Sequence, residues 1–418
     1  MNVPKHVTVL GAGIVGLSTA RFIQRAGIRV TLIDRLEPGH GCSFGNLAMI
    51  CSLENALPIP SLQVLRSVPK NLLSREGSLV IRPQYLPKLV PWLSRFVYNS
   101  LPSRRQRHAK SLAALLKESV SAYVDLVGRS GAQVHLREHG SITVFETDSG
   151  FDANSKDRHL LRALGARYDE LNQHELMELE PALAPIFRHA VYYHGCAQVV
   201  SPFGLCQALA NQIRESGGEI IRNEVHHAEL MADGRFCLFV HEGQIECEAL
   251  VVAAGAWSGH VARWFGKKVP LETERGYHTT MSNLDVNLKR PITHGETNIG
   301  MVQLNEGLRF GGTVELAGLD APPDYVRARN IHNMARRTIA DLPLDESLEI
   351  TNWMGFRPTL PDYLPVIGPC PNHSNLWYAF GHQHIGLSLA ACTGRIISRL
   401  VLGVKNQIDM APYRIDRF

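Results

Sequence analysis

The chain has 418 residues, of which 45% are hydrophobic and 20% are charged, and its formal net charge is +4. This composition excludes a wholly disordered chain, and so small a net charge does not indicate a nucleic-acid-binding protein. The length predicts two or three domains, or two domains built from interleaved segments. The chain has no apolar run of about 18 residues and its first residues lack signal-peptide features, so we expect a cytoplasmic protein without a membrane-spanning helix.

The eight cysteines are scattered along the chain, and none of them forms a C-x-x-C pair. Structural zinc and iron–sulfur sites use closely spaced cysteines, so the sequence predicts no metal site. We expect reduced thiols, most of them buried, as is usual in cytosolic proteins.

The first 34 residues have the order strand, glycine-rich turn, helix, strand. Short apolar strands are predicted at residues 7–10 and 29–33, and a helix is predicted at 17–25. The turn between the first strand and the helix reads G-x-G-x-x-G, and the second strand ends at Asp34. This spacing is typical of a dinucleotide-binding site.

Each residue type in this motif has a physical reason. Gly11 permits the tight turn, Gly13 lets a pyrophosphate approach the backbone, and Gly16 lets the helix pack on the sheet. The helix N-terminus attracts the anion. Asp34 is placed to accept hydrogen bonds from the ribose hydroxyls.

The loop after the acid bears on whether the nucleotide is FAD or NAD. Residues 39–46 are rich in glycine and also contain serine and asparagine. Such a loop can follow a second set of phosphate and flavin atoms, whereas a simple NAD enzyme would have another helix here. The pattern therefore favours FAD, and an ordinary surface loop is the alternative.

A basic segment follows. Residues 77–117 contain no Asp or Glu but eight Lys or Arg. Residues 83–110 also contain Leu, Trp and Phe, so this segment could lie on an anionic membrane surface at the inner face of the membrane. We favour the other interpretation, helices packed on the domain with a solvated basic face, because Pro87, Pro91 and Pro102 interrupt a long amphipathic helix.

The strand–helix–strand order returns about 190 residues later. A helix is predicted from Pro202 to the glycines at 217–218, and a strand at 219–222 follows it. A further apolar strand at 249–253 runs directly into Ala254-Gly255-Ala256-Trp257. Small residues after a core strand let a ligand approach the backbone, although a plain turn into a helix is the alternative.

These observations predict an α/β protein in which a Rossmann-type FAD-binding domain is interleaved with an α+β substrate domain. The second domain would contain a large mixed or antiparallel sheet, with strands in "LETERGYHTTMS", "GMVQLNE" and "GLRFGGTVEL". We assign residues 1–80, 196–265 and 351–418 to the FAD-binding domain, and 81–195 and 266–350 to the substrate domain.

The C-terminal region predicts a strand, a glycine-rich turn and a long apolar helix, in "NLWYAFGHQHIGLSLAACTGRIISRLVLG". Gly381, Gly386, His382 and His384 stand where this helix begins. A helix N-terminus there would stabilise the negative charge of a reduced flavin. The two histidines could equally be capping or loop residues.

The stretch "MGFRPTLPDYLPVIG" places Arg357 beside a proline and ahead of a buried strand. A guanidinium stays charged at ordinary pH and is normally solvated. Arg357 is therefore either a surface residue beside a turn or a residue held inside to bind an anion.

The chain as a whole resembles the D-amino-acid oxidase/glycine oxidase (DAO) superfamily of flavoproteins, and most of all its bacterial D-amino-acid dehydrogenase branch. The resemblance covers nearly the whole chain and rests on the order of seven stretches. They are "VLGAGIVGLSTARFI…VTLIDR", "GCSFGNLAMI", "VVAAGAW", "RGYHTT", "GLRFGGTVEL", "GFRPTLPDYLPVIG" and "GHQHIGLSLAACTGRIISRLV".

The resemblance implies non-covalently bound FAD and a set of site residues. Arg357 matches the arginine that anchors the substrate carboxylate, Tyr277 would place a hydroxyl over the substrate, and His384 would face the active site. Tyr277 could instead be a strand residue packed in the interior, and His278 alternates to the other face of that strand. The implied cofactor-binding residues are Gly11, Gly13, Ile14, Val15, Gly16, Asp34, Arg35, Ser43, Asn46, Ala48, Val225, Ala254, Gly255, Trp257, Gly381, His382, Gly386 and Leu387.

The implied activity is oxidative deamination of a D-amino acid, including cyclic substrates such as D-proline or D-hydroxyproline. A hydride would pass from Cα to flavin N5, and the imine would give a 2-oxo acid. The alternatives are an oxidase or dehydrogenase of glycine, sarcosine or an opine, or the flavin subunit of a multi-subunit amine dehydrogenase. The electron acceptor is left open among a quinone, a partner subunit and O2.

Two departures from the branch pattern put the substrate in doubt. Leu47-Ala48-Met49 stands where branch members commonly have Ala-Gly, and Gln383 and His384 stand where small residues are common.

Overall fold

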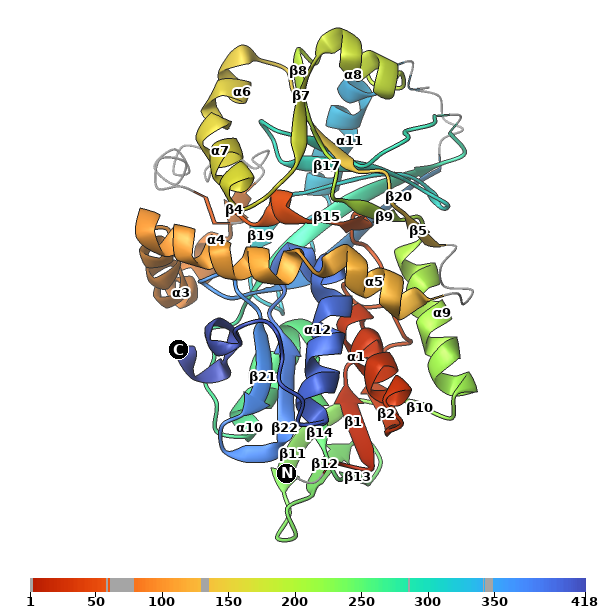
Figure 1. The fold of residues 1–418 in the computed structure, drawn as a ribbon, viewed down its shortest axis with the longest axis vertical. Coiled ribbons are helices and arrows are strands. Elements are labelled where there is room, and N and C mark those ends of the chain that lie inside the picture. Colours follow the sequence, from red (N-terminus) through yellow and green to blue (C-terminus); the bar gives the residue numbers. More distant parts are fainter. Residues whose placement is uncertain are drawn as a thin grey trace.

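The structure is a computed structural model that describes residues 3–57, 59–60, 79–128, 135–284, 286–340, 342 and 349–418. Two large sheets lie one above the other in Figure 1; helix α3 lies at the left edge of the view, and α4 and α5 run across it at the level between the sheets. Those helices span Leu86–Asn99, Pro102–Leu116 and Ser119–Val127. Among the described residues, none of the helices is both long and apolar enough to cross a bilayer.

The lower sheet carries the glycine-rich turn. Within the described residues it has six strands in the order β10-β2-β1-β14-β22-β21. All neighbours are parallel except β21 and β22, which are antiparallel. The bounds are Glu219–Arg222 (β10), Arg29–Asp34 (β2), His6–Leu10 (β1), Leu250–Val252 (β14), His373–Phe380 (β22) and Val366–Cys370 (β21). Three distant segments thus form one Rossmann-type sheet, which confirms the predicted fold class.

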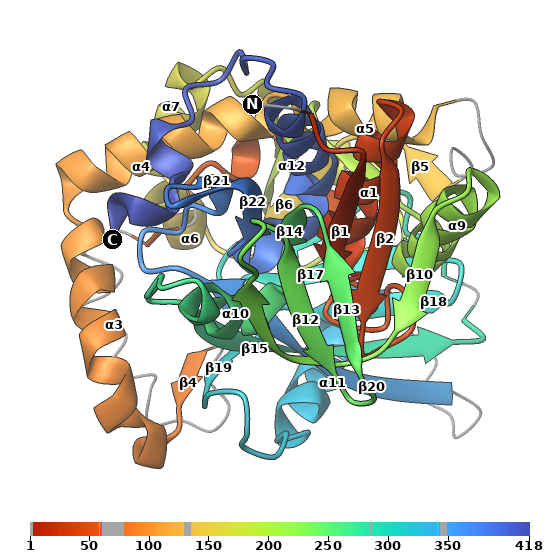
Figure 2. The same ribbon diagram turned by 90° about the horizontal axis from the view of Figure 1, so that it is seen from below.

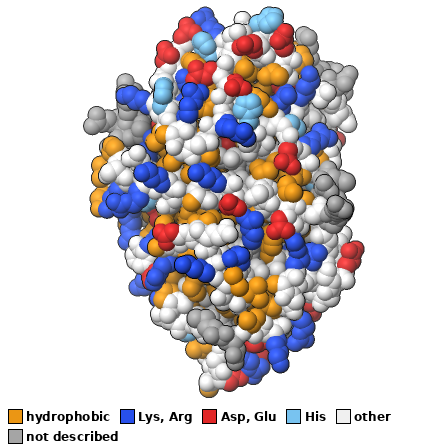
Figure 3. All heavy atoms as spheres, viewed as in Figure 1, with side chains coloured by type: hydrophobic (Ala, Val, Ile, Leu, Met, Phe, Trp, Pro, Cys, Tyr) orange, Lys and Arg blue, Asp and Glu red, His pale blue; other side chains and the backbone are white. Residues whose placement is uncertain are grey.

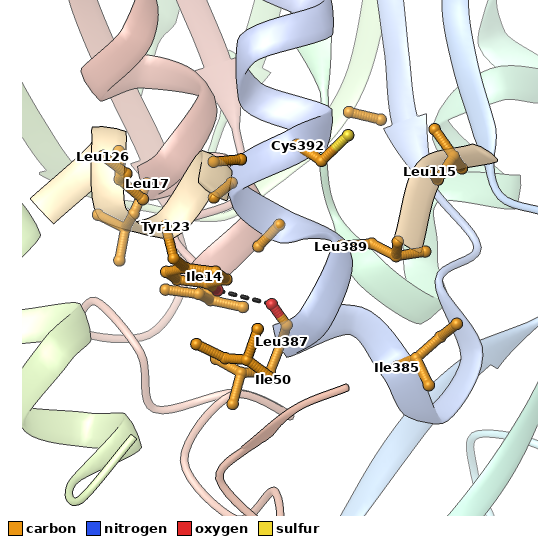
Figure 4. Close-up of a cluster of buried hydrophobic side chains, with 14 of the residues drawn as sticks. Ile14, Leu17, Ile50, Leu115, Tyr123, Leu126, Ile385, Leu387, Leu389 and Cys392 are labelled. Carbon is orange, nitrogen blue, oxygen red and sulfur yellow. Dashed lines mark hydrogen bonds between the residues drawn. The ribbon is translucent and has the colours of Figure 1, made fainter. Parts of the chain in front are cut away.

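Helices α1 (Ile14–Arg25) and α12 (Gly386–Val401) pack side by side against this sheet, and α9 (Pro202–Glu215) lies next to α1. A Cβ at Gly394 of α12 would be only 2.7 Å from the carbonyl carbon of Ser18, so glycine permits the close approach. In Figure 4 the Tyr123 hydroxyl donates a 2.6 Å hydrogen bond to the Leu387 carbonyl at the start of α12. The N-termini of α1 and α12 therefore open toward the same space.

The upper sheet is mixed, as predicted. Its described strands run in the order β4-β19-β15-β18-β17-β16-β6-β8-β7, and β20 also pairs with β15. Most pairs are antiparallel, but β4–β19 and β6–β16 are parallel. The bounds are Leu79–Ile81 (β4), Val314–Leu316 (β19), Glu272–Ser282 (β15), Gly307–Gly311 (β18), Ile299–Leu304 (β17), Ile292–His294 (β16), Ser141–Phe145 (β6), His189–Tyr193 (β8), Tyr168–Asn172 (β7) and Glu349–Thr359 (β20).

Smaller elements complete the described fold. The β11–β12–β13 sheet lies over the Rossmann-type sheet in Figure 2, in which α3 stands at the edge of the molecule. The bounds are Val225–Leu230 (β11), Phe236–Val240 (β12), Gln244–Cys247 (β13), Met49–Ile50 (β3), Ala197–Val199 (β9), Leu136–Arg137 (β5), Asp148–Ala153 (α6), Ser155–Ala163 (α7), Gln173–Leu179 (α8), Ser258–Trp264 (α10) and Val326–Thr338 (α11).

The expected domain boundaries near residues 80 and 351 lie within β4 and β20, which pair with strands of the upper sheet. One detail of the sequence interpretation needs correction. Pro91 lies inside α3 and does not end it, whereas Pro102 begins α4 at the first turn, where a missing N–H costs nothing. The division into two interleaved domains stays a prediction.

Candidate active site

A cavity of about 1600 Å³ separates the two large sheets and is lined by residues of both. It extends from Gly11 and Asp34, through the loop at 41–49 and the start of α12, to Arg357 on β20. Pockets for one small ligand usually measure roughly 300–1000 Å³. This cavity therefore has room for a dinucleotide together with a substrate.

The glycine-rich turn has the geometry that a pyrophosphate needs. Gly11 has φ +114°, and a Cβ at Gly16 would lie 1.8 Å from the Gly11 carbonyl oxygen, so both positions require glycine. Gly13 differs, because its backbone is extended and a Cβ there would meet only the Ser43 hydroxyl, at 3.2 Å. Gly13 has no side chain to cap α1, and within the described residues Ser43 Oγ accepts only from the Ile14 N–H, so further N–H groups of the first turn remain for an anion.

Asp34 is held beside this turn at the end of β2. Its two carboxylate oxygens accept hydrogen bonds from the backbone N–H groups of Ala12 (2.7 Å) and Leu36 (2.9 Å). Each oxygen keeps a second lone pair, and the side chain lines the cavity. The geometry suits a ribose acceptor.

Arg35, Glu224 and Trp257 form a cluster of side chains at the same end of the cavity as Asp34. The Arg35 guanidinium is 4.0 Å from the ring centroid of Trp257 and 3.6 Å from the Glu224 carboxylate. Val225 begins β11 beside them, and Gly255 takes φ +54° in the turn that carries Ala254 and Trp257. The structure thus brings together predicted residues from three distant segments.

The loop between β2 and β3 is folded by Asn46. Its side-chain amide donates to the Ser43 carbonyl and accepts from the Ala48 N–H, each at 2.7 Å. Ala48 has φ +56°, a left-handed conformation that non-glycine residues rarely adopt. Ser43 also accepts a 2.9 Å bond from the Ile14 N–H of α1, so this loop and the glycine-rich turn are joined.

Side chains of the upper sheet hold the same loop from the other side. His278 Nδ1 lies 2.9 Å from the Gly45 carbonyl, and Arg309 Nη1 donates to the carbonyls of Phe44 (3.3 Å) and Asn46 (2.9 Å). Arg309 is buried, which lowers its pKa to about 10, and it forms no ion pair within the described residues. Three consecutive carbonyls are therefore bound by two side chains of the opposite sheet. The sequence interpretation set His278 aside and missed Arg309.

Replacing Arg309 with methionine should lower the free energy of unfolding by about 1.5–3 kcal/mol, because hydrogen bonds from a charged group are lost in a buried place. FAD affinity should fall as well, since the loop at 43–48 loses its support. Urea unfolding and FAD titration check both effects. Arg263→Met, on the exposed side of α10, is the control. Unchanged FAD affinity in the Arg309 variant would contradict the positioning role.

The paired strands β15 and β20 form the floor of the cavity at the end away from Asp34. Directly opposed residues share one face, and here the pairs are Glu274 with Arg357, Gly276 with Gly355, and His278 with Trp353. Because the central pair has no side chains, the Arg357 and Trp353 side chains lie directly over its backbone. A Cβ at Gly276 would lie 2.2 Å from Arg357 Nη2, and one at Gly355 would lie 1.9 Å from the Trp353 ring. Trp353 in turn stacks on His278, with ring centroids 5.1 Å apart.

Arg357 lies in the cavity wall and not beside a surface turn. Its Nη1 donates a 3.0 Å hydrogen bond to the Thr313 carbonyl, and within the described residues it forms no ion pair. The Glu274 carboxyl is nearby, but burial raises its pKa and its oxygen accepts from the Tyr363 hydroxyl. A guanidinium held in this way has N–H donors left for an anion.

The Tyr277 side chain lies on the opposite face of β15 from Gly276. It is 1% exposed and does not point toward Arg357. Its hydroxyl donates to Glu315 Oε2 at 2.6 Å and accepts from the Asp324 N–H at 2.9 Å. The alternation of a strand thus places Tyr277 in the core, although the strand itself runs along the cavity.

The turn before α12 places its two histidines differently. His382 is buried, its Nε2 lies 2.9 Å from Thr393 Oγ1 within α12, and burial lowers its pKa to about 3. His384 is accessible from the cavity; burial among the surrounding protein, with a contribution from Arg357, lowers its pKa to about 4. Both rings are therefore neutral near pH 7. Gly381, with φ +83°, makes the turn that precedes them.

The protein-family model described as FAD dependent oxidoreductase matches residues 6–400. The chain belongs to this family. This FAD dependent oxidoreductase is 34% identical over 418 residues to a D-amino-acid oxidase of Bradyrhizobium diazoefficiens, with 99% of each chain covered. It is 28% identical over 403 residues to a D-amino acid dehydrogenase of Vibrio cholerae serotype O1, with 94% of each chain covered.

Solved structures of other proteins share its fold. Glycine oxidase from Geobacillus kaustophilus superposes with a TM-score of 0.73 at 22% identity, covering 99% of this chain and 98% of that one. L-proline dehydrogenase from P. horikoshii gives a TM-score of 0.72 at 18% identity, covering 100% and 98%. The predicted family, the enzymatic character and the FAD cofactor are confirmed, and the open helix N-terminus beside Asp34 fits that cofactor.

Proposed function

We propose that this FAD dependent oxidoreductase oxidises the Cα–N bond of a D-amino acid, acyclic or cyclic, to an imine and then a 2-oxo acid. The observation that carries the proposal is Arg357, a guanidinium with donors to spare over a glycine floor at the far end of the dinucleotide cavity. Such a planar fork matches the two oxygens of a carboxylate in a bidentate pair. The D configuration is favoured by the names of the relatives, D-amino-acid oxidase and D-amino acid dehydrogenase.

We infer a place in the cavity for each part of FAD. The pyrophosphate would lie at the N-terminus of α1 over Gly13, and the ribose at Asp34. The adenine end would lie by Arg35, Val225 and Trp257. The flavin ring would lie between the loop at 43–48 and the turn at 381–387, where the 16-residue helix α12 directs its positive end into the cavity. Bound FAD supplies the two-electron acceptor of the reaction.

The side chains of this chain orient the substrate more than they transfer protons. A bidentate pair with Arg357 would fix the carboxylate and therefore the direction of the Cα–H bond. Trp353 covers one side of the glycine floor. His384 and His278, with pKa values near 4 and 3, are weak bases, so the substrate ammonium would lose its proton to solvent.

Anaerobic mixing of the holoenzyme with a substrate panel tests this proposal. D-amino acids, including D-proline, should bleach the flavin absorbance, whereas their L-enantiomers should not. If glycine, sarcosine or an opine alone bleaches it, the D-amino-acid assignment fails. If nothing bleaches it until another polypeptide is added, the flavin-subunit alternative is correct. Peroxide formation in air separates O2 from a quinone or partner subunit as the acceptor.

His384 provides a pH test of the weak-base argument. His384→Asn should leave the acidic limb of the kcat/KM profile between pH 5.5 and 8 unchanged, because the wild-type ring, with a pKa of about 4, is already neutral there. Stopped-flow reduction rates across this range check the result. A limb that moves in the variant would show that His384 titrates in the reaction.

We further propose that α3 contacts an anionic membrane surface. Leu86, Val90, Val97, Tyr98 and Leu101 are exposed along or next to this helix. Lys88 and Arg95 are exposed on α3, and Arg107 and Lys110 on α4. Apolar and basic side chains lie together over α3 and α4 at the left edge of Figure 3. Such a surface complements anionic lipid headgroups.

Flotation with vesicles tests this contact. The enzyme should float with phosphatidylserine-containing vesicles and not with neutral ones, and Lys88→Glu/Arg95→Glu should abolish flotation. Arg263→Glu/Arg336→Glu, exposed on α10 and α11, is the matched control. Equal flotation of both double variants would remove the proposal.

A further inference from the structure

Tyr363 is a bulky residue in a backbone conformation that normally belongs to glycine. It lies in the loop between β20 and β21 and has φ +56°. This backbone conformation is unfavourable for a residue with a bulky side chain, and it persists only when the surrounding structure holds the residue in place. An outlier of this kind at a cavity wall calls for a functional explanation.

The surroundings of Tyr363 hold it from every side. Its N–H donates to the Leu360 carbonyl at 2.9 Å, and its carbonyl accepts from the side-chain amide of Gln383, which is itself left-handed at φ +48°. Its neighbours are fixed by Arg417, which bonds the Asp362 carboxylate at 2.8 Å and the Leu364 carbonyl at 2.6 Å. The loop is therefore rigid, and the direction of the ring is determined.

The ring lies where the inner cavity meets the apolar residues of α3. Its centroid is 6.4 Å from that of His384 and 5.5 Å from that of Phe96 on α3. Its hydroxyl donates to Glu274, the residue directly opposite Arg357 on the β15–β20 floor. Beyond it, Tyr363 packs in a cluster with Ile59, Leu89, Trp92 and Leu316, to which Leu79, Ile81, Leu93 and Phe96 are added at its edge.

This placement gives the ring a role in selecting the substrate. A substrate whose carboxylate binds Arg357 lies next to the Glu274–Tyr363 pair. On the side of the ring away from Arg357, Trp92, Leu93 and Phe96 of α3 line the same cavity and pack with Tyr363 in the apolar cluster. The ring therefore occupies the space between the Arg357 end of the cavity and α3, and its removal would extend that end toward apolar side chains.

We propose that Tyr363 is a specificity-determining residue, whose ring limits the substrate to small side chains by filling the space between the Arg357 end of the cavity and the apolar residues of α3. The inference rests on the proposed function only in naming the ligand as an amino acid. The steric claim holds for any carboxylate at Arg357.

The experiment compares Tyr363→Gly with Tyr363→Phe in the holoenzyme. Glycine adopts φ +56° without strain, so the loop should keep its course, and phenylalanine keeps the ring without the hydroxyl. Dissociation constants of acetate, benzoate and 3-phenylpropionate are measured from the change in the flavin spectrum, without any turnover. The thermal midpoint and the FAD content show that each variant is folded.

The expected result is a gain of at least tenfold in affinity for the two aromatic carboxylates in Tyr363→Gly, with acetate changed less than threefold. Tyr363→Phe should keep the wild-type order. An unchanged ratio of aromatic to acetate affinity in the glycine variant overturns the proposal. A phenylalanine variant that behaves like the glycine variant also overturns it, because the hydroxyl and not the ring would then be decisive.

This design separates the two proposals. If no D-amino acid is oxidised but the carboxylate affinities change as expected, the proposed function fails and the role of Tyr363 stands. If D-amino acids are oxidised and the ratio does not change, the reverse holds. Where both stand, Tyr363→Gly should raise kcat/KM for D-phenylalanine relative to D-alanine by about the same factor.

Discussion

Replacing Arg357 with methionine is expected to leave FAD bound and to lower kcat/KM for carboxylate-bearing substrates roughly 30- to 5000-fold. This fall corresponds to a loss of about 2–5 kcal/mol of transition-state stabilisation. The physical reason is that the substrate carboxylate would lose its charged partner in a cavity where water is restricted. The guanidinium lies over Gly276 and bonds only a backbone carbonyl among its described neighbours, so its removal leaves the floor intact.

Three measurements check this prediction. FAD content and the thermal midpoint should match the wild type, and the dissociation constant of acetate should rise with the fall in kcat/KM. Arg357→Lys should recover part of the loss, because an ammonium keeps the charge but cannot form the bidentate pair. Arg336→Met, on the exposed face of α11, is the control. Wild-type turnover in the methionine variant would remove Arg357 from the site, and loss of FAD would assign it a structural role.

Gly13→Val is expected to abolish FAD binding while the apo protein still folds. Gly13 has an extended backbone that valine accepts, and its Cβ would meet only the Ser43 hydroxyl. The added side chain would nevertheless occupy the place where the pyrophosphate approaches the helix. We expect the dissociation constant of FAD to rise by at least about 100-fold, which removes the stabilisation of about 2.7 kcal/mol that FAD at 100 times its Kd provides.

Neighbouring glycines supply the controls for this variant. Gly16→Ala should destabilise the apo protein itself, since its Cβ would lie 1.8 Å from the Gly11 carbonyl oxygen. Gly41→Ala, where a Cβ meets nothing within 4 Å, should leave folding unaffected. Thermal midpoints with and without added FAD distinguish the three cases. A Gly13→Val protein that FAD still stabilises fully would show that the pyrophosphate does not lie over this residue.

The sequence alone was enough to predict the dinucleotide-binding half of the protein, because the motif that indicates it is local in the chain. The strand, the glycine-rich turn, the helix and the acid at Asp34 follow each other within 34 residues, and each imposes its geometry on its neighbours in the chain. The order of motifs along the chain was also enough to indicate the FAD family. Tertiary structure was not needed for either conclusion.

Tertiary structure decided the substrate half, because strand pairing is not a local property. The register of β15 with β20 places His278 and Gly276 on the cavity face and Tyr277 in the core, and a shift of one residue would reverse this. The positioning role expected of Arg309 follows from its hydrogen bond to the Asn46 carbonyl, and the role proposed for Tyr363 follows in part from its hydrogen bond to the Glu274 carboxyl. The hydrogen-bond partners of these two side chains lie more than 80 positions away in the sequence, so only the folded chain shows which residues they are.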